Sequence, residues 1–424
     1  MVEPLVKEMS PVKRGDSGIP RLQELTFLQK ALEAVVGGGT FEDVRTRLID
    51  HMASRRQGDF ELDAAEFRRL ARSDLARYAS NATEALAELM RLGMVERVSL
   101  PSTRKALIAY RGRRFTATSK GVEWHDLLAA SITTAYDDLL KVLWRQHSQF
   151  AGYLLLLSRG ALVVPTANWS DVHPALTGVE GRGPYVVFLA KRVAQAVATA
   201  TTGWSATQEE IEAAIREYLD ARLKAAELRH ASSPYPRNRD FVGACEEALV
   251  SFAFRRAGIP LDYISHEILR RWTKDLGVAN FSYHVPDLPA LRLWATADIA
   301  VVDGLPDIKR RVGPELIEMA IGEIPAAYDQ ARRMERDTSW VPIYRVRACL
   351  CARLRVGDGV FDEAFREFLA QARRGELPYS VNLEISEIGS IPPTERPFRL
   401  RDASGRETVY RSMNLTAEAA RRIG

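Results

Sequence analysis

Apolar side chains recur every three to four residues along the first quarter of the chain, which indicates a series of helices. Asp63 is expected to cap one of them, and Gly93 is expected to end the last, because glycine readily closes a helix in the left-handed conformation. The other helices are predicted over residues 22–36, 40–54 (with Thr40 as N-cap) and 79–92.

The period changes to about two residues after these helices, which predicts a β-hairpin. One strand is expected over 95–100 and the other over 106–110, and the turn between them contains Pro101-Ser102-Thr103. Thr118 then caps a closing helix. Three helices, a hairpin and a further helix follow the layout of a winged helix.

Two strings in this region resemble bacterial winged-helix regulators. Met94-Val-Glu-Arg97 is similar to the start of the wing, and Phe115-Thr-Ala-Thr-Ser-Lys-Gly121 is similar to the start of the last helix. In those regulators a glycine, a hydrophobic residue and a valine open the wing, and a Thr-x-x-Gly string opens the helix. The resemblance covers about 100 residues, from 22 to 128, and implies binding to double-stranded DNA.

Positive charge is concentrated in the same part of the chain. Residues 66–120 hold 12 Lys or Arg against 5 Asp or Glu, a local excess of 7, whereas the whole chain has a formal net charge of +4. Such a patch is typical of a phosphate-binding surface, and a solvated basic face would give the same count. The residues expected to contact DNA are Arg72, Arg77, Arg97, Arg104, Lys105, Arg111, Arg113 and Arg114.

A wide apolar stripe predicts one long helix over about 120–158. Such a helix often mediates dimerisation or connects domains, and a core helix of the same module fits the pattern equally well. Residues 160–183 have the composition of a loop, and helices are expected over 185–198 and 208–230.

The fold class that these patterns predict is a multidomain α+β protein with an N-terminal winged helix, a helical middle and a C-terminal α/β domain built on a mixed sheet. The expected segments are a tail at 1–20, the winged helix at 21–130, the helical middle at 131–231, a linker at 232–240, the α/β domain at 241–390 and an extension at 391–424.

The C-terminal α/β domain is expected to alternate helices and strands. Helices are predicted over 241–257 and 324–335, and strands over 297–302, 315–321 and 341–356. Acidic residues occur in the first helix and in the first two strands. This order resembles the restriction-endonuclease-like core of the PD-(D/E)xK superfamily.

The resemblance implies metal-dependent cleavage of a phosphodiester. Asp298 and Glu318 would bind Mg²⁺ from neighbouring strands, and the ion would activate water and stabilise charge on the phosphate. Glu246 or Glu247 would be the helical acid of the motif. Gln330 stands where some members of the superfamily place a glutamine.

The sequence departs from this motif at Ala320, which occupies the position of the motif's lysine. Three alternatives stay open: a basic residue from elsewhere replaces the lysine, the domain is catalytically inactive, or the alignment is wrong. A purely structural interpretation also fits, in which Asp298 caps a turn and Glu318 lies at a solvated sheet end. The candidate replacements for the lysine are Lys309, Arg332 and Arg333.

Four arginines share one face of the predicted strand 341–356: Arg345, Arg347, Arg353 and Arg355. The forked donors of arginine suit phosphate, so Arg345 and Arg347 are further candidates for DNA contact. An exposed face paired with acids such as Glu384 and Glu387 is at least as consistent with the pattern.

Several function classes are disfavoured. The sequence has no P-loop, Rossmann glycine fingerprint, HExxH motif or nucleophile elbow. Its most apolar run, 153–157, is too short to span a membrane, and no signal peptide is apparent. Three cysteines fit a reducing cytoplasm and lack the spacing of a zinc site.

Three hypotheses follow. The first is a cytoplasmic DNA-directed protein with a Mg²⁺-dependent nuclease domain, suited to restriction, antiviral defence or mobile elements by analogy. The second is a non-enzymatic DNA-binding or scaffold protein, as a homodimer or a subunit of a larger complex, whose last domain binds a partner or a small effector. The third uses the winged helix as a protein–protein module.

Overall fold

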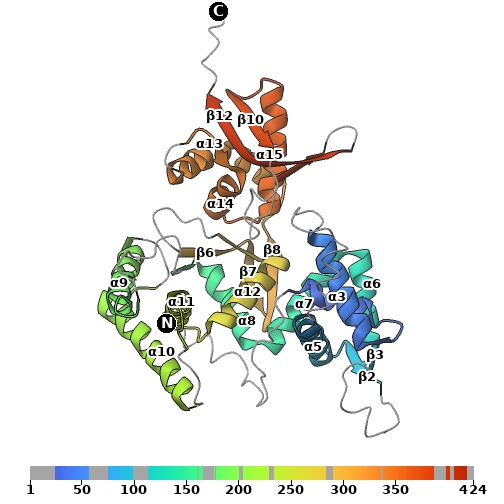
Figure 1. Ribbon diagram of the computed structural model, residues 1–424. Coiled ribbons are helices and arrows are strands. Elements are labelled where there is room, and N and C mark those ends of the chain that lie inside the picture. Colours follow the sequence, from blue (N-terminus) through green and yellow to red (C-terminus); the bar gives the residue numbers. More distant parts are fainter. Residues whose placement is uncertain are drawn as a thin grey trace, which may run out of the picture. The chain divides into compact units, whose positions relative to one another are not determined.

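The computed structural model describes residues 24–56, 75–98, 113–160, 162–165, 176, 178–199, 204–228, 234–282, 290–335, 338–385, 398–401 and 405–417. The fold is α+β, with helices and small antiparallel sheets (Figure 1). Contacts divide the chain into an N-terminal unit, the described residues of 15–147 and 384–411, and a C-terminal unit, those of 148–383 and 412–424. In the described part, no helix is long and apolar enough to cross a membrane.

The N-terminal unit combines helices with a three-stranded sheet. The sheet order is β1-β3-β2, and both pairings are antiparallel, with Gly39 opposite Phe115 and Val95 opposite Ala117. The elements are α2 (Thr26–Glu33), β1 (Gly39–Thr40), α3 (Phe41–Arg56), α5 (Leu75–Arg91), β2 (Val95–Arg97), β3 (Arg114–Ala117), α6 (Ser119–Ala130) and α7 (Ile132–Gln146).

The capping signals of the described part of this unit are confirmed. The Oγ1 of Thr40 accepts a hydrogen bond from the backbone of Asp43 at 3.3 Å, and the Asp43 carboxylate accepts one from the Thr40 backbone at 2.7 Å. This reciprocal arrangement satisfies backbone donors at the start of α3. Gly93 has a φ of 71° and follows α5, as expected. The predicted Asp63 cap and the strand 106–110 lie outside the described residues.

The single long helix predicted over 120–158 is wrong, because the chain forms α6, α7 and α8 (Ser148–Arg159) there. Ser131 and His147 both have extended backbone angles between successive helices, and Ser131 caps α7 through its hydroxyl. A break of one residue leaves the apolar spacing nearly unchanged, so the pattern does not reveal it. Trp124, Leu139 and Trp144 are buried within the chain itself, which agrees with the core interpretation of the stripe.

The C-terminal unit is larger and mostly helical. In Figure 1, α9 lies beside α10, and α13, α14 and α15 pack against one another. The helices after α8 are α9 (Arg182–Thr199), α10 (Gln208–Leu228), α11 (Asn238–Arg256), α12 (Tyr263–Asp275), α13 (Pro314–Met334), α14 (Ile343–Leu354) and α15 (Asp358–Arg373). The strands from residue 162 onward are β4 (Leu162–Pro165), β5 (Ala279–Ser282), β6 (Ala290–Ala295), β7 (Ala297–Val302), β8 (Leu305–Arg310), β9 (Val341–Pro342), β10 (Tyr379–Ile385), β11 (Phe398–Arg401) and β12 (Glu407–Ala417). Of these, β11 belongs to the N-terminal unit.

The mixed sheet expected in 241–390 is replaced by separate small sheets. β4, β6 and β5 form one antiparallel sheet, and β7 pairs with β8 as an antiparallel hairpin. A further sheet has the order β10-β12-β11, with β9 also paired to β12. β4 falls in the predicted loop 160–183. The predicted linker 232–240 lies inside the C-terminal unit, where Tyr235 is buried and α11 begins at Asn238.

Two predicted strands are helical, and both corrections concern the nuclease-like pattern. Residues 315–321 belong to α13, which Pro314 starts at its first position and whose buried side chains recur at helical spacing, as in Ile321, Ile324 and Tyr328. Residues 343–354 form α14, and only 341–342 are strand. A short apolar run of this kind fits a strand or a buried helix equally well from periodicity alone.

Candidate nucleic-acid interface

A single threonine before α6 forms hydrogen bonds to the residues that follow α5. The Thr118 hydroxyl donates to the Gly93 carbonyl at 2.7 Å, and the Thr118 backbone N–H donates to the Met94 carbonyl at 3.0 Å. The hydroxyl also accepts from the Gly121 N–H at 3.2 Å and so caps α6. Lys120 adds a hydrogen bond from Nζ to the Leu92 carbonyl at 3.1 Å. These contacts fix where the chain enters and leaves the β2–β3 hairpin.

Close packing at the same junction explains the glycine of the Thr-x-x-Gly string. A Cβ atom at Gly121 would lie 2.0 Å from the Met94 carbonyl oxygen, which is far inside contact distance. Only glycine allows this approach without displacing the backbone. The string therefore has a structural reason in this chain, which is the docking of α6 against the turn after α5.

The paired strands β2 and β3 adjoin this junction in the chain. β2 and β3 pair from Val95–Ala117 to Arg97–Phe115, and the Val98 N–H donates to the Arg114 carbonyl at 3.0 Å. Within the paired strands, Val95 and Phe115 are buried, whereas Arg97 and Arg114 are exposed. Residues 99–112, between the two strands, lie outside the described part.

The eight predicted DNA-contacting residues have the following positions. Arg97 and Arg114 are exposed on β2 and β3, Arg113 is half-buried just before β3, and Arg77 lies on α5. Four others lie outside the described residues: Arg72, Arg104, Lys105 and Arg111.

A buried cluster of charges anchors α5. Glu88 is 1% exposed and accepts hydrogen bonds from Arg91, and Arg91 also donates to the Gln146 side chain at 2.9 Å. The His147 Nε2 lies 3.6 Å from a Glu88 oxygen. Burial by itself raises the pKa of Glu88, but hydrogen bonds from His147 and Arg91 outweigh it and hold that pKa below its ordinary value. The cluster connects the end of α5 to the end of α7.

The predicted metal ligands do not form a pair on adjacent strands. Asp298 lies on β7 with a 68% exposed side chain, and its carboxylate accepts from Arg311 at 2.6 Å. The hydrogen bond and the charge of Arg311 lower the pKa of Asp298. Glu318 is exposed on α13 rather than on a strand. A carboxylate held by a guanidinium, with its predicted partner on a helix, does not fit the Mg²⁺ site of the motif.

The other residues of the nuclease prediction are dispersed. Glu246 is half-buried on α11, and Gln330 is half-buried on α13. Glu247 accepts hydrogen bonds from Tyr218, at 2.7 Å, and from Arg222. Over the described ranges, no group of three or more His, Cys, Asp or Glu side chains could hold a metal ion.

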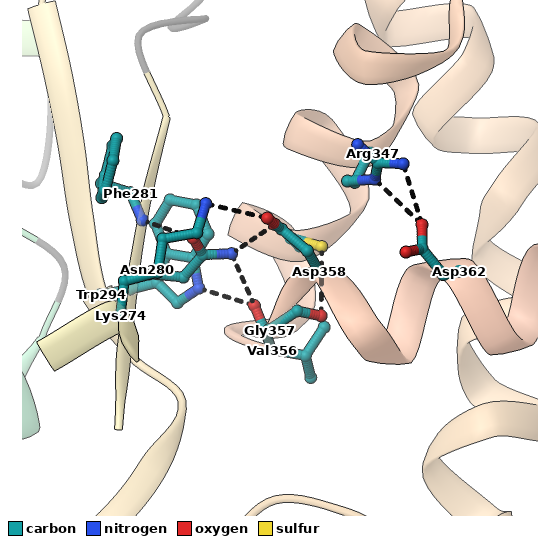
Figure 2. A network of polar contacts seen from close by, with 10 residues as sticks. Lys274, Asn280, Phe281, Trp294, Arg347, Val356, Gly357, Asp358 and Asp362 are labelled. Atoms are coloured by element: carbon teal, nitrogen blue, oxygen red, sulfur yellow. Dashed lines mark hydrogen bonds and ion pairs between the residues drawn. The ribbon is translucent and has the colours of Figure 1, made fainter. Parts of the chain in front are cut away.

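The arginines of residues 343–354 are held by carboxylates. Arg347 is 3% exposed and donates to the Asp362 carboxylate at 2.9 and 3.2 Å (Figure 2). Arg345 forms an ion pair with Glu335. These two predicted DNA contacts therefore have acidic partners, Glu335 at the end of α13 and Asp362 on α15. Of the acids suggested for them from the sequence, Glu384 is on β10 and Glu387 lies outside the described residues.

A second polar network lies beside this pair and gives no signal in the sequence. In Figure 2, Lys274 and Asn280 converge on Asp358 at the start of α15, each at 2.8 Å. The Trp294 indole N–H donates to the Val356 carbonyl at 3.0 Å. The carboxylate and its partners are about 80 residues apart in the chain (78 between Asn280 and Asp358), so no local motif could predict the network. It fixes the α14–α15 junction against β5 and β6.

No protein-family model matches the chain, and neither the curated proteins nor the solved structures that were searched include a match.

Proposed function

We propose that residues 24–147 form a winged-helix module that binds double-stranded DNA. The observation that carries this proposal is the three-stranded sheet of order β1-β3-β2. A helix precedes β1, helices separate β1 from β2, and β2 and β3 form the hairpin that a winged helix uses as its wing. The resemblance in the Gly93–Gly121 region supports the same assignment.

The charge of the hairpin supports nucleic acid as the partner. Arg97 and Arg114 are exposed on the two strands, and the segment between them adds Arg104, Lys105, Arg111 and Arg113 with no acidic residue from 98 to 113. Basic side chains on a wing contact backbone phosphates and release counterions, which gives affinity that falls steeply with salt. Sequence recognition would come from a helix, and α5 is the helix that leads directly into the hairpin.

We propose DNA binding without assigning a cleavage step. Cleavage through Asp298 and Glu318 requires the two carboxylates on neighbouring strands, and Glu318 is on α13. The arrangement therefore favours the second hypothesis, a DNA-binding or scaffold protein whose C-terminal unit binds a partner or an effector.

The test is duplex binding by fluorescence anisotropy across a salt series with the full chain. Substituting Arg97 and Arg114 together by alanine is expected to weaken binding about tenfold and to reduce the slope of log K against log salt by about 1–2. Arg145→Ala is the matched control, because Arg145 is an exposed arginine of the same unit on α7.

The result that would refute the winged-helix assignment is an unchanged affinity and slope in the double variant. An equal loss in the Arg145→Ala variant would also count against it, because binding would then follow net charge rather than the hairpin.

A further inference from the structure

Arg355 interacts electrostatically with two other arginines from separate elements, and with Asp298, in the C-terminal unit. Arg292 lies on β6, Arg311 directly follows β8, and Arg355 lies between α14 and α15. Arg311 is placed by its backbone N–H, which donates to the Thr296 carbonyl at 3.2 Å, and by its side chain, which donates to Asp298 at 2.6 and 3.2 Å. The Asp298 carboxylate therefore already accepts hydrogen bonds from one of the three guanidinium groups.

Arg355 is held in an unusual conformation. Its φ is 56°, in the left-handed region that a non-glycine residue rarely adopts, and its Nη2 donates to the Leu157 carbonyl at 3.2 Å. The Nε atom is buried and has no hydrogen-bond partner. A buried donor without an acceptor costs free energy, so the side chain has an unused capacity to bind an anion.

Arg292 is directed to the same junction by the alternation of β6. Trp294 is two residues further on the same face of the strand, and its indole N–H donates to the carbonyl of Val356, the neighbour of Arg355. Arg292 is half-buried, and no carboxylate of the described part forms an ion pair with it. The strand geometry therefore places a second incompletely neutralised guanidinium close to Arg355.

The three charges influence one another. Burial lowers the pKa of Arg355, and the positive charges of Arg311 and Arg292 lower it further, while Asp298 acts in the opposite direction. The one carboxylate among these charges, that of Asp298, is hydrogen-bonded to Arg311. An anion with several oxygens would relieve this repulsion and supply acceptors for the free donors.

We propose that Arg292, Arg311 and Arg355 form a binding site for a phosphate group. The group could come from a phosphorylated small molecule or from a nucleic-acid backbone, and in both cases its oxygens are recognised by forked guanidinium donors. The Asp298 carboxylate is hydrogen-bonded to Arg311, and a bound phosphate would compete with it for that guanidinium. The site is in the C-terminal unit and does not depend on the winged-helix assignment.

The test is isothermal titration of the full chain with inorganic phosphate, with ionic strength held constant by sodium chloride. Arg292→Gln and Arg355→Gln are each expected to weaken phosphate binding about tenfold. Asp298→Asn is expected to strengthen it several-fold, because it releases Arg311. Arg255→Gln, an exposed arginine on α11 of the same unit, is the matched control and should bind like the original chain.

The same variants identify the source of the phosphate by anisotropy with duplex DNA. Weaker DNA binding in Arg292→Gln and Arg355→Gln, but not in Arg255→Gln, assigns the group to a nucleic-acid backbone. Unchanged DNA binding with weakened phosphate binding assigns it to a free phosphorylated compound. The proposal is overturned if neither ligand distinguishes these variants from the control.

Two further measurements check the folding of one variant and separate the phosphate site from the winged-helix assignment. Arg355→Gln loses a contact to Leu157 and could unfold the unit, so circular dichroism is used to check that this variant folds. If it does not fold, Arg292→Gln and Asp298→Asn provide the test. The Arg97 and Arg114 double variant should keep its phosphate affinity, which separates this proposal from the winged-helix assignment.

Discussion

Arginine side chains meet different surroundings in the β2–β3 hairpin and in the helices α13–α15. On the hairpin, Arg97 and Arg114 are exposed, and residues 98–113 between them include four basic residues and no acidic one. Around α14, each arginine from 345 to 353 has a carboxylate partner on another helix or at its end. The pairs are Arg345 with Glu335, Arg347 with Asp362 and Arg353 with Glu323.

The difference shows that an arginine-rich stretch does not by itself indicate a phosphate-binding surface. A guanidinium that is saturated by a carboxylate has few donors left, and its charge is locally cancelled. Such a residue holds helices together. The arginines that remain available for anions are those whose donors the carboxylates of the fold do not all occupy.

The largest expected effect comes from breaking the buried pair of Arg347 and Asp362. Arg347→Leu would leave the Asp362 carboxylate buried at 4% exposure without its main cation. Removing one partner of a buried ion pair typically costs about 3–5 kcal/mol. Urea unfolding, followed by circular dichroism, measures this loss.

A double variant separates charge from packing at this pair. Replacing both Arg347 and Asp362 by leucine should recover much of the stability, since no charge is then left buried. If the free energy of unfolding falls by less than about 1 kcal/mol in the single variant, the claim that these arginines stabilise the fold is contradicted.

The second effect concerns Glu88, whose buried carboxylate accepts hydrogen bonds from Arg91 in the N-terminal unit. Glu88→Gln should cost about 2 kcal/mol at neutral pH, because a charge-assisted hydrogen bond in a buried site is lost. The pKa of Glu88 is below its ordinary value of 4.5 in the folded chain. Its contribution is therefore fully present above pH 4.5 and is lost as the pH falls through the lower folded pKa.

The measurement is the free energy of unfolding against pH for the original chain and for Glu88→Gln. The difference between the two should shrink below pH 4.5 and stay constant above it. Glu84→Gln on the same helix is the matched control and should show a much smaller change. A pH-independent difference would mean that the carboxylate charge is not what stabilises α5.

Local chemistry made much of the N-terminal unit predictable. Thr40, Gly93 and Thr118 act within a few residues of their position, so their roles at helix ends can be inferred from the sequence and are confirmed. The Thr-x-x-Gly string can be identified for the same reason, because its residues are close together in the sequence. The clash that makes Gly121 necessary involves the Met94 carbonyl and becomes apparent only when the fold is known.

The C-terminal unit was less predictable because its decisive contacts are distant in sequence. Residues 341–356 alternate polar and apolar side chains, yet α14 forms, with Ile343, Val346 and Leu350 buried at helical spacing. Packing against α13 and α15 decides between two conformations that the pattern allows equally. The candidate arginines Arg292 and Arg311 also lack a local motif, and the pairing of Asp298 with Lys309 across β7 and β8 is the register that places Arg311 nearby.

The smallest effect should come from Arg353, whose partner Glu323 is at 2.7 Å but whose side chain is 50% exposed. Arg353→Ala should change the unfolding free energy by less than about 1 kcal/mol, because solvent screens the pair and ordering two long side chains costs entropy. The contrast with Arg347→Leu tests whether burial, rather than pairing alone, decides which arginines support the fold. A loss as large as that of Arg347→Leu would break this distinction, and α13–α15 would then depend on their surface ion pairs as well.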